Sequence, residues 1–213
     1  MINRIKELAK RFHKDIVNIR RYLHEFPGLS FEEYNAIQVI HNFLTSWNIE
    51  HEPMTPTGIV AVIRGRNPGK KTIALRADTD ALPIQEKNKC PYKSSVPGVM
   101  HACGHDAHTA MLLGVARILN LLKDEFEGTI KLIFQPGEEK LPGGASLMIK
   151  HGVLKGVDAI IAQHVYPDLP CGEVGFHAGE YMASCDEINI TVSGKGGHAA
   201  KIKERSNTTV AAA

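Results

Sequence analysis

The sequence predicts an α/β fold in which helices flank a mixed, mostly parallel β-sheet. Two helical patterns fill the first 50 residues, and short β-rich runs then alternate with helical runs from residue 59 to residue 163. Such alternation is typical of parallel strands at the centre of a sheet. Apolar residues make up 43% of the 213 residues, which is enough for a packed core and argues against a disordered chain.

Two amphipathic helices are expected at the start of the chain. Apolar residues across Ile5–Leu23 recur at spacings of three and four, which predicts one apolar stripe on a helix that ends before Pro27. Ser30 and Glu33 have the spacing of a capping box, so a second helix is expected to follow and to extend through Trp47. We interpret both helices as packing elements, and the histidines on them as solvated: His13, His24 and His41.

From residue 59 onward, the pattern changes to short strands separated by helices. The first two runs of strand-forming residues are separated by the turn sequence Asn67–Pro68–Gly69. The expected strands are Ile59–Arg64, Thr72–Arg76, Thr129–Phe134 and Ala159–Gln163, and the expected helices are Ala107–Leu122 and Ala145–Lys150.

Potential metal ligands follow the carboxyl ends of the expected strands. In open α/β sheets, ligands bind in the crevice beyond these ends. We therefore expect the side chains found there to gather at one rim of the sheet. They are Asp78 and Asp80 after the second strand, Glu138 and Glu139 after the third, His164 at the end of the fourth, and Cys103 and His105 before the helix at 107–122.

The stretch His101–His108 holds three histidines, a cysteine and an aspartate within eight residues. This is a dense set of soft and borderline metal ligands directly before a helix. It lacks the C-x2-C spacing of structural zinc sites, and a lone cysteine is commonly a small buried side chain. Taken alone, the stretch is equally consistent with a metal-binding loop and with an ordinary polar loop.

Two pairs of carboxylates indicate a division of labour. Glu138 and Glu139 are adjacent on a turn, so their side chains diverge, and one can bind a cation while the other accepts a proton from water. Without a metal, the same pair would be a solvated turn. Asp78 and Asp80 have the spacing to orient a histidine or to tune a ligand, and Asp78 is almost as well explained as a loop-capping aspartate.

Four motifs in order resemble the successive motifs of the M20 metallopeptidase superfamily. Within it, they resemble the amidohydrolase branch of hippurate hydrolases, N-acyl-amino-acid hydrolases and indoleacetyl-amino-acid hydrolases. The motifs are spread over almost the whole chain, and together they are far more specific than any one of them. They are Arg76–Pro83 (RADTDALP), Met100–Asp106 (MHACGHD), Phe134–Glu139 (FQPGEE) and Gly194–Ala200 (GKGGHAA).

The resemblance implies a zinc-exopeptidase-like catalytic domain that holds two divalent metal ions: zinc, manganese, cobalt or nickel. It implies that Glu138 is the general base for a water molecule bridging the metals, that Asp80 assists, and that Cys103 lies between the ions as a thiolate. The implied reaction is hydrolysis of the amide bond of an N-acyl amino acid or short peptide. The implied metal ligands are Cys103, His105, Glu139 and His164.

The resemblance also implies a domain division and an assembly. Residues 1–180 would be the amino-terminal part of the catalytic domain, and residues 181–213 would begin an inserted α+β lid or dimerisation domain. His198 resembles the histidine that this smaller domain offers to the tetrahedral oxyanion from the partner subunit of a homodimer. Family members run to nearly twice this length, so strand Glu187–Val192 is expected to be an unpaired edge.

Composition excludes other classes of partner. The formal net charge is +2 with both signs interspersed, so neither nucleic acid nor an anionic membrane is expected as a partner. The first twelve residues carry charges throughout, which fits neither a secretory signal nor a membrane span, and a cytoplasmic location is expected. In that reducing compartment the cysteines at positions 90, 103, 171 and 185 should be thiols.

Two alternatives remain open. The chain could be a catalytically inactive fragment that binds metal weakly or serves as an interaction module, because the family's last metal-binding histidine is expected to be absent. Cys103 could instead act as a nucleophile with a histidine base and no metal, although Glu138 and Glu139 would then have no role. The sequence also departs from the family at Ile202–Lys203 and Asn207–Thr208, where Pro-His and Asp-Pro pairs are usual.

Overall fold

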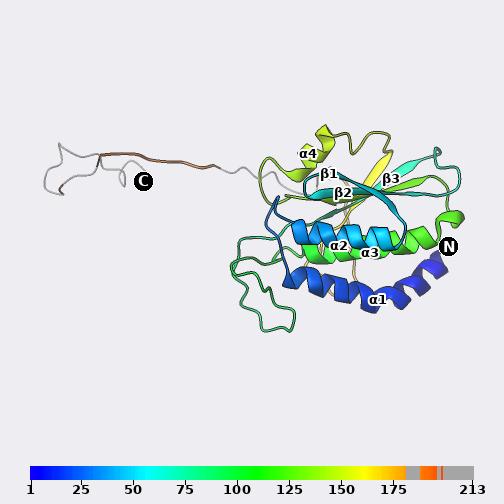
Figure 1. Ribbon diagram of the computed structural model, residues 1–213, viewed down its shortest axis with the longest axis horizontal. Coiled ribbons are helices and arrows are strands. Elements are labelled where there is room, and N and C mark those ends of the chain that lie inside the picture. Colours follow the sequence, from blue (N-terminus) through cyan, green and yellow to red (C-terminus); the bar gives the residue numbers. More distant parts are fainter. Residues whose placement is uncertain (181–187, 196–197, 199–213) are drawn as a thin grey trace. The chain divides into compact units, whose positions relative to one another are not determined.

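The computed structural model describes residues 1–180, 188–195 and 198 (Figure 1). The chain divides into two compact units, Met1–Pro167 and Asp168–Ala213, and all helices and strands of the described residues lie in the first unit. The expected domain division at residue 180 stays a prediction. The expected strand Glu187–Val192 is wrong at residues 188–192, which are exposed and form no strand, because an apolar run needs a paired neighbour to be stable as one. Glu187 lies outside the described residues.

Five strands form one mixed sheet in the order β1-β2-β4-β3-β5. β3 pairs in parallel with β4 and β5, whereas β2 runs antiparallel to β1 and β4. The strands β1, β4, β3 and β5 therefore point the same way, which confirms the predicted mixed, mostly parallel sheet. The strands are β1 (Glu50–Thr55), β2 (Gly58–Arg64), β3 (Thr72–Asp78), β4 (Thr129–Gln135) and β5 (Ala159–Ala162).

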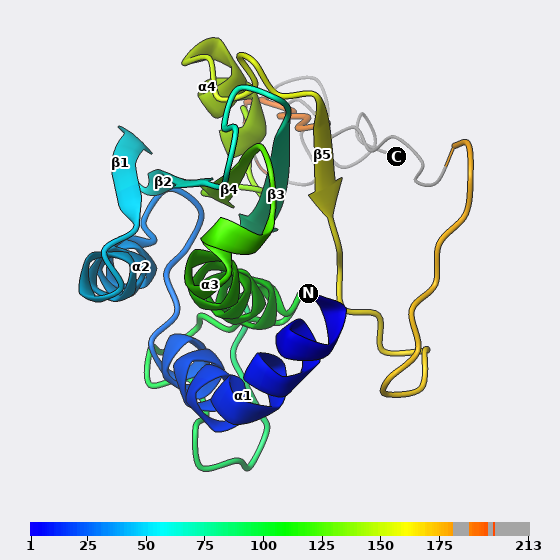
Figure 2. The same ribbon diagram turned by 90° about the vertical axis from the view of Figure 1, so that its right-hand side faces the viewer.

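Helices cover both faces of this sheet, as Figure 2 shows. α2 and α3 pack on one face, α1 lies over α3 as a further layer, and α4 covers the other face. No helix in the described part of the chain is long and apolar enough to cross a membrane. The helices are α1 (Ile2–Glu25), α2 (Tyr34–Ser46), α3 (His105–Leu121) and α4 (Gly144–Lys150), with a 3-10 turn η1 (Lys123–Glu125) after α3. The strands and helices predicted between residues 59 and 163 are confirmed to within two residues at each end.

Side chains of the central strands alternate between two cores. On β4, Leu132 and Phe134 belong to the larger core shared with α2 and α3, whereas Ile133 packs with Met148 in a smaller core under α4. All four side chains are buried. Because both faces of β3 and β4 are covered, these strands are held firmly, and their carboxyl ends meet at one rim of the sheet.

The capping box predicted from Ser30 and Glu33 does not form. Ser30 Oγ donates to Asp80 Oδ2 at 2.7 Å, and Glu33 Oε1 accepts from the Gly137 amide at 2.7 Å. α2 begins at Tyr34 without a side-chain cap. Both side chains turn away from the helix end because buried polar groups at the rim of the sheet offer them partners.

One strand is absent from the sequence-based prediction. β1 is mostly polar and contains Pro53, a composition that ordinarily argues against a strand. It pairs only with β2 and forms the edge of the sheet, where a missing N–H and exposed polar side chains are tolerated. Position at an edge, rather than the pattern of residues, explains this strand.

Candidate metal centre

The residues predicted to bind metal come together where β3, β4 and β5 end and α3 begins. In three sets of side chains, one ligand atom from each residue lies within 4.8 Å of the others, and His105 belongs to all three sets. The sets are Cys103–His105–His164, Asp78–His105–His108 and His105–Glu138–Glu139. The structure thus gathers all four predicted ligands and the predicted base around His105, while their roles stay predictions.

His105 presents an unpaired nitrogen to this cluster. Its Nδ1 lies 3.0 Å from the backbone oxygen of Asp80, and because a carbonyl oxygen only accepts, Nδ1 carries the hydrogen. In the neutral ring the lone pair is therefore on Nε2, which is buried and has no hydrogen-bond partner. The nearest charged atoms are Asp78 Oδ2 at 3.7 Å and Glu139 Oε1 at 3.8 Å. A buried lone pair beside two carboxylates fits a divalent cation.

Cys103 and His164 are predicted metal ligands that lie on another side of this cluster. The Nδ1–H of His164 donates to the oxygen of Val165 at 2.7 Å, so the Nε2 lone pair faces Cys103 Sγ at 3.3 Å. Burial, followed by a hydrogen bond to Glu139 and the charges of nearby carboxylates, raises the pKa of the Cys103 thiol to about 12. A cation placed between sulfur and imidazole would displace the thiol proton, as metal ligation by cysteine requires.

Asp80 contacts Nδ1 of His105, the ring nitrogen that does not face the other predicted ligands. Its carboxylate accepts hydrogen bonds from Ser30 Oγ at 2.7 Å and from the Glu139 amide at 2.9 Å, and its Oδ1 lies 3.2 Å from His105 Nδ1. Burial alone would raise the pKa of Asp80, but the hydrogen bonds from His105, Glu139 and Ser30 outweigh it and lower the value to about 2. Asp80 is therefore a carboxylate that orients the imidazole.

Asp78 also contacts histidine rather than capping a loop. Its Oδ1 lies 2.6 Å from His108 Nδ1, and its Oδ2 accepts from Arg76 at 2.8 Å. Burial raises the pKa of Asp78, but the His108 hydrogen bond and the charges of His105 and Arg76 outweigh it and lower the value. Of the two interpretations left open for Asp78, the structure supports the one in which it orients a histidine.

Glu138 and Glu139 follow a turn that requires glycine. Gly137 has φ of +53°, and a Cβ there would lie 2.4 Å from the Phe31 ring. This turn sends Glu139 toward His105. Burial and then the charge of Glu139 raise the pKa of Glu138, which makes that carboxylate a stronger proton acceptor.

A second buried polar cluster involves Asp106 of the stretch His101–His108. His24, predicted to be solvated, is only 4% exposed, so that prediction is wrong, whereas His13 and His41 are exposed as predicted. His24 Nδ1 lies 2.7 Å from Asp106 Oδ2, and its Nε2 lies 3.2 Å from Glu86 Oε1. The cause is the packing of the last turn of α1 against the start of α3, which buries this face of α1.

The three histidines of the stretch His101–His108 have different surroundings. His105 faces the predicted ligands, and His108 contacts Asp78. His101 instead lies 6.5 Å from the His24 ring, and burial lowers its pKa to about 4, so it is neutral. Sequence reasoning did not assign His108, Ser30 or Glu33 to the site. The one local signal for His108 was its spacing of three from His105, which places both on one face of α3.

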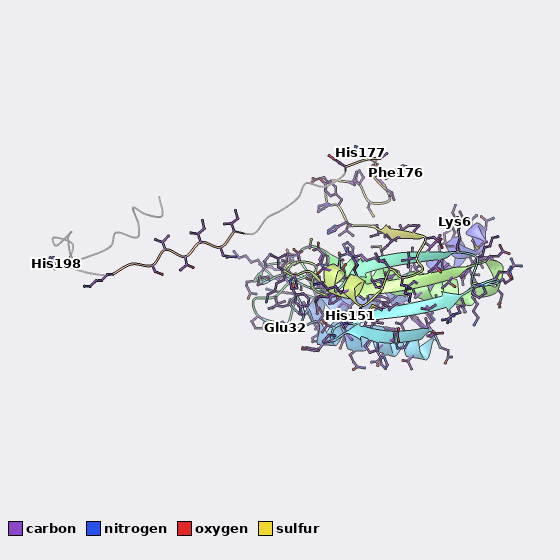
Figure 3. The ribbon with its side chains drawn as sticks, turned by 90° about the horizontal axis from the view of Figure 1, so that it is seen from above. Lys6, Glu32, His151, Phe176, His177 and His198 are labelled. Carbon is purple, nitrogen blue, oxygen red and sulfur yellow. The ribbon has the colours of Figure 1, made fainter. Side chains whose placement is uncertain are left out.

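The remaining predicted residue, His198, lies in the second unit (labelled in Figure 3), and its role stays a prediction.

One family model and several characterised proteins match this chain. The model of peptidase family M20/M25/M40 matches residues 74–213. An N-acetylcysteine deacetylase from Bacillus subtilis (strain 168) is 48% identical over 192 residues, which cover 89% of this chain and 50% of that protein. An N-acyl-L-amino acid amidohydrolase from Geobacillus stearothermophilus is 45% identical over 197 residues, which cover 92% of this chain and 53% of that protein. The chain spans about half the length of these curated relatives.

Solved structures share the fold. A Bacillus subtilis protein described as a dinuclear metal binding peptidase from the M20 family matches with a TM-score of 0.73 and 48% identity, covering 76% of this chain and 46% of that chain. Human carnosine dipeptidase 1 matches with a TM-score of 0.57 at 16% identity, covering 78% of this chain and 41% of that chain. The second match shows the fold alone, and both agree with the predicted α/β catalytic domain.

Proposed function

Because the chain belongs to peptidase family M20/M25/M40, we propose that it forms the metal-binding part of a hydrolase that cleaves the amide bond of N-acyl amino acids. The similarity to an N-acetylcysteine deacetylase and to an N-acyl-L-amino acid amidohydrolase supports this substrate class. The observation that carries the proposal is the buried, unpaired Nε2 of His105, which lies among carboxylate, thiol and imidazole groups. Those groups are the ligands that divalent transition metals take in proteins.

The proposed mechanism assigns one task to each residue. Cys103, His105, Glu139 and His164 would hold two divalent ions, which polarise the amide carbonyl and make water more acidic when bound. Glu138 accepts a proton from water as the water oxygen attacks the carbonyl carbon. It then delivers the proton to the amine nitrogen as the C–N bond breaks, so the products are a free amine and a carboxylic acid, which loses its remaining proton to solvent. Asp80 keeps Nδ1 of His105 protonated and its Nε2 free for the metal.

Further parts of the proposal extend beyond the first unit. We propose zinc, manganese, cobalt or nickel as the ions, since a ligand set of thiolate, imidazole and carboxylate suits these metals. We propose a cytoplasmic homodimer in which His198 stabilises the oxyanion in the partner subunit's site. In this proposal, residues 1–180 belong to the catalytic domain and residues 181–213 begin a lid or dimerisation domain. The homodimer, the domain division and the role of His198 rest on the family resemblance of the sequence motifs.

Metal content and turnover test the proposal together. In the complete gene product, Glu138→Gln should retain both ions but lower turnover of an N-acetyl amino acid by about 100-fold or more, because it removes the proton acceptor and little else. Cys103→Ala should lower the metal content measured by mass spectrometry. Glu32→Gln, which changes an exposed carboxylate near the same rim, is the control (Figure 3).

Each opposing result has a distinct meaning. Wild-type turnover in Glu138→Gln would exclude this residue as the base, and unchanged metal content in Cys103→Ala would exclude the thiol as a ligand. Turnover that persists in a strong chelator would favour a Cys103 nucleophile. One loosely held ion, or none, in the wild-type chain would support an inactive fragment.

A further inference from the structure

His108 lies among the candidate metal ligands, yet both of its ring nitrogens are already engaged. It is on the first turn of α3 and only 3% exposed. Its Nε2 accepts the backbone N–H of Val165 at 2.9 Å, and its Nδ1 lies 2.6 Å from Asp78 Oδ1. Because a backbone N–H only donates, Nε2 must carry the lone pair, and Nδ1 must carry the hydrogen that is donated to Asp78. His108 therefore has no free lone pair for a metal.

Val165, the residue whose backbone N–H His108 accepts, contacts several segments of the candidate metal centre. Val165 accepts the Nδ1–H of His164 at its carbonyl oxygen, at 2.7 Å. Its side chain lies over Gly104, where an added Cβ would be 2.5 Å from Val165 Cγ2. Gly104 stands between the predicted ligands Cys103 and His105, so Val165 contacts the segments that carry three of the four predicted ligands.

Val165 lies beyond the end of the sheet. The pairing of β5 with β3 ends at Ala162, two residues before His164. The bond from Val165 N–H to His108 therefore continues the attachment of this segment after the ladder has ended. The His108 ring also meets the His164 ring edge to face, with 4.5 Å between centroids.

We propose that His108 is a positioning residue, whose Nε2 accepts the backbone N–H of Val165 and thereby holds His164 Nε2 opposite Cys103. This inference rests on the proposed metal centre. A ligand held in place before the metal arrives loses less freedom on binding, and removal of such supporting partners commonly weakens metal affinity by about 10–100-fold.

Two substitutions of His108 separate its hydrogen bond to Val165 from its hydrogen bond to Asp78. An asparagine side chain can donate to Asp78 in place of Nδ1 but does not reach Val165, whereas a glutamine side chain can present an acceptor oxygen to Val165 but loses the Nδ1–H. Under the proposal, His108→Asn should weaken cobalt binding by about 10–100-fold and alter the sulfur-to-cobalt absorption band. His108→Gln should stay within about threefold of the wild type in affinity and keep the band, because the attachment of Val165 survives.

A matched control comes from the next residue. Thr109 is also buried on α3 and donates to the backbone oxygen of Asp78 at 2.9 Å, so Thr109→Val removes an α3–β3 hydrogen bond without touching Val165. It should leave both the cobalt affinity and the absorption band unchanged. Thermal unfolding of all variants without metal would show that each is folded.

Nitrogen-15 spectra of the histidine rings test these hydrogen bonds in the metal-free wild-type chain. His108 should be neutral with hydrogen on Nδ1, and finding the hydrogen on Nε2 would overturn the proposal. Equal loss of cobalt affinity in His108→Asn and His108→Gln would also overturn it, because only the packing of the ring would then matter. Wild-type affinity in His108→Asn would refute the positioning role alone, whereas failure of the wild-type chain to bind cobalt would refute the metal centre as well.

Discussion

Replacing Glu33 by leucine should destabilise the fold and disturb the turn that carries Glu138. Glu33 is completely buried, and its Oε1 accepts the N–H groups of Phe31 at 2.9 Å and of Gly137 at 2.7 Å. Leucine is similar in size but offers no acceptor, so both amides would lose their partner. Leaving a buried donor unpaired costs about 1–3 kcal/mol, so the free energy of unfolding should fall by about 2–6 kcal/mol for the two amides.

A glutamine at the same position separates the acceptor from the charge. Burial raises the pKa of Glu33, and the hydrogen bonds that it receives only partly offset this, so a negative charge is unfavourable here. Glutamine keeps an oxygen for both amides and is neutral, so Glu33→Gln should change the unfolding free energy by less than about 1 kcal/mol. Glu32→Leu, at the exposed neighbouring position, should change it by less than about 0.5 kcal/mol.

Urea denaturation followed by circular dichroism, on metal-free samples, measures these differences. Zinc titration of the same variants reports whether the turn still presents Glu139 to the metal. If Glu33→Leu is as stable as the Glu32→Leu control, the two amides have other partners and the reasoning is refuted. If Glu33→Gln loses as much stability as Glu33→Leu, the charge and not the acceptor matters.

Two further predictions concern the turn and the second polar cluster. Gly137→Ala should lower the melting temperature and the zinc affinity, since positive φ and contact with the Phe31 ring cost about 1–3 kcal/mol; unchanged values in calorimetry would contradict this. The hydrogen bond from His24 to Asp106 raises the pKa of His24 above 6.5. Because the folded-state pKa is the higher one, the stability that His24 supplies should be complete below about pH 6.5 and be lost as the pH rises through the folded-state value. The difference in unfolding free energy between wild type and His24→Gln should therefore shrink from pH 6 to pH 9, and a constant difference would argue against a charged His24.

The spacing of apolar residues predicted most of the fold, because most of its helices and strands show the spacing typical of their type. The stripes of α1 and α2 and the apolar runs of β2, β3 and β4 are visible in sequence, and burial on both sides explains those runs. β1 could not be found in this way because Pro53 and its polar neighbours are acceptable only at an edge. Whether a strand is central or at the edge is decided by pairing with distant residues.

The candidate site was predicted by position but not by contact. Carboxyl ends of parallel strands meet at one edge, which is why Asp80, Glu139 and His164 could be placed together before their distances were known. The supporting contacts escaped prediction because they join remote parts of the chain. Ser30 contacts Asp80 across 50 residues, and Glu33 contacts Gly137 across 104, while their spacing of three imitated a helix cap.

The connection between α1 and α2 should therefore tolerate insertions less well than an ordinary surface loop. Surface loops usually accept inserted residues, fused peptides or deletions, because their backbone makes few hydrogen bonds and packing contacts. Here Ser30 contacts Asp80 after β3, and Phe31 and Glu33 contact Gly137 after β4. Inserting a single residue into this connection would displace all three side chains at once. In a library of random insertions, the connection should therefore be among the stretches of the chain that tolerate insertion least.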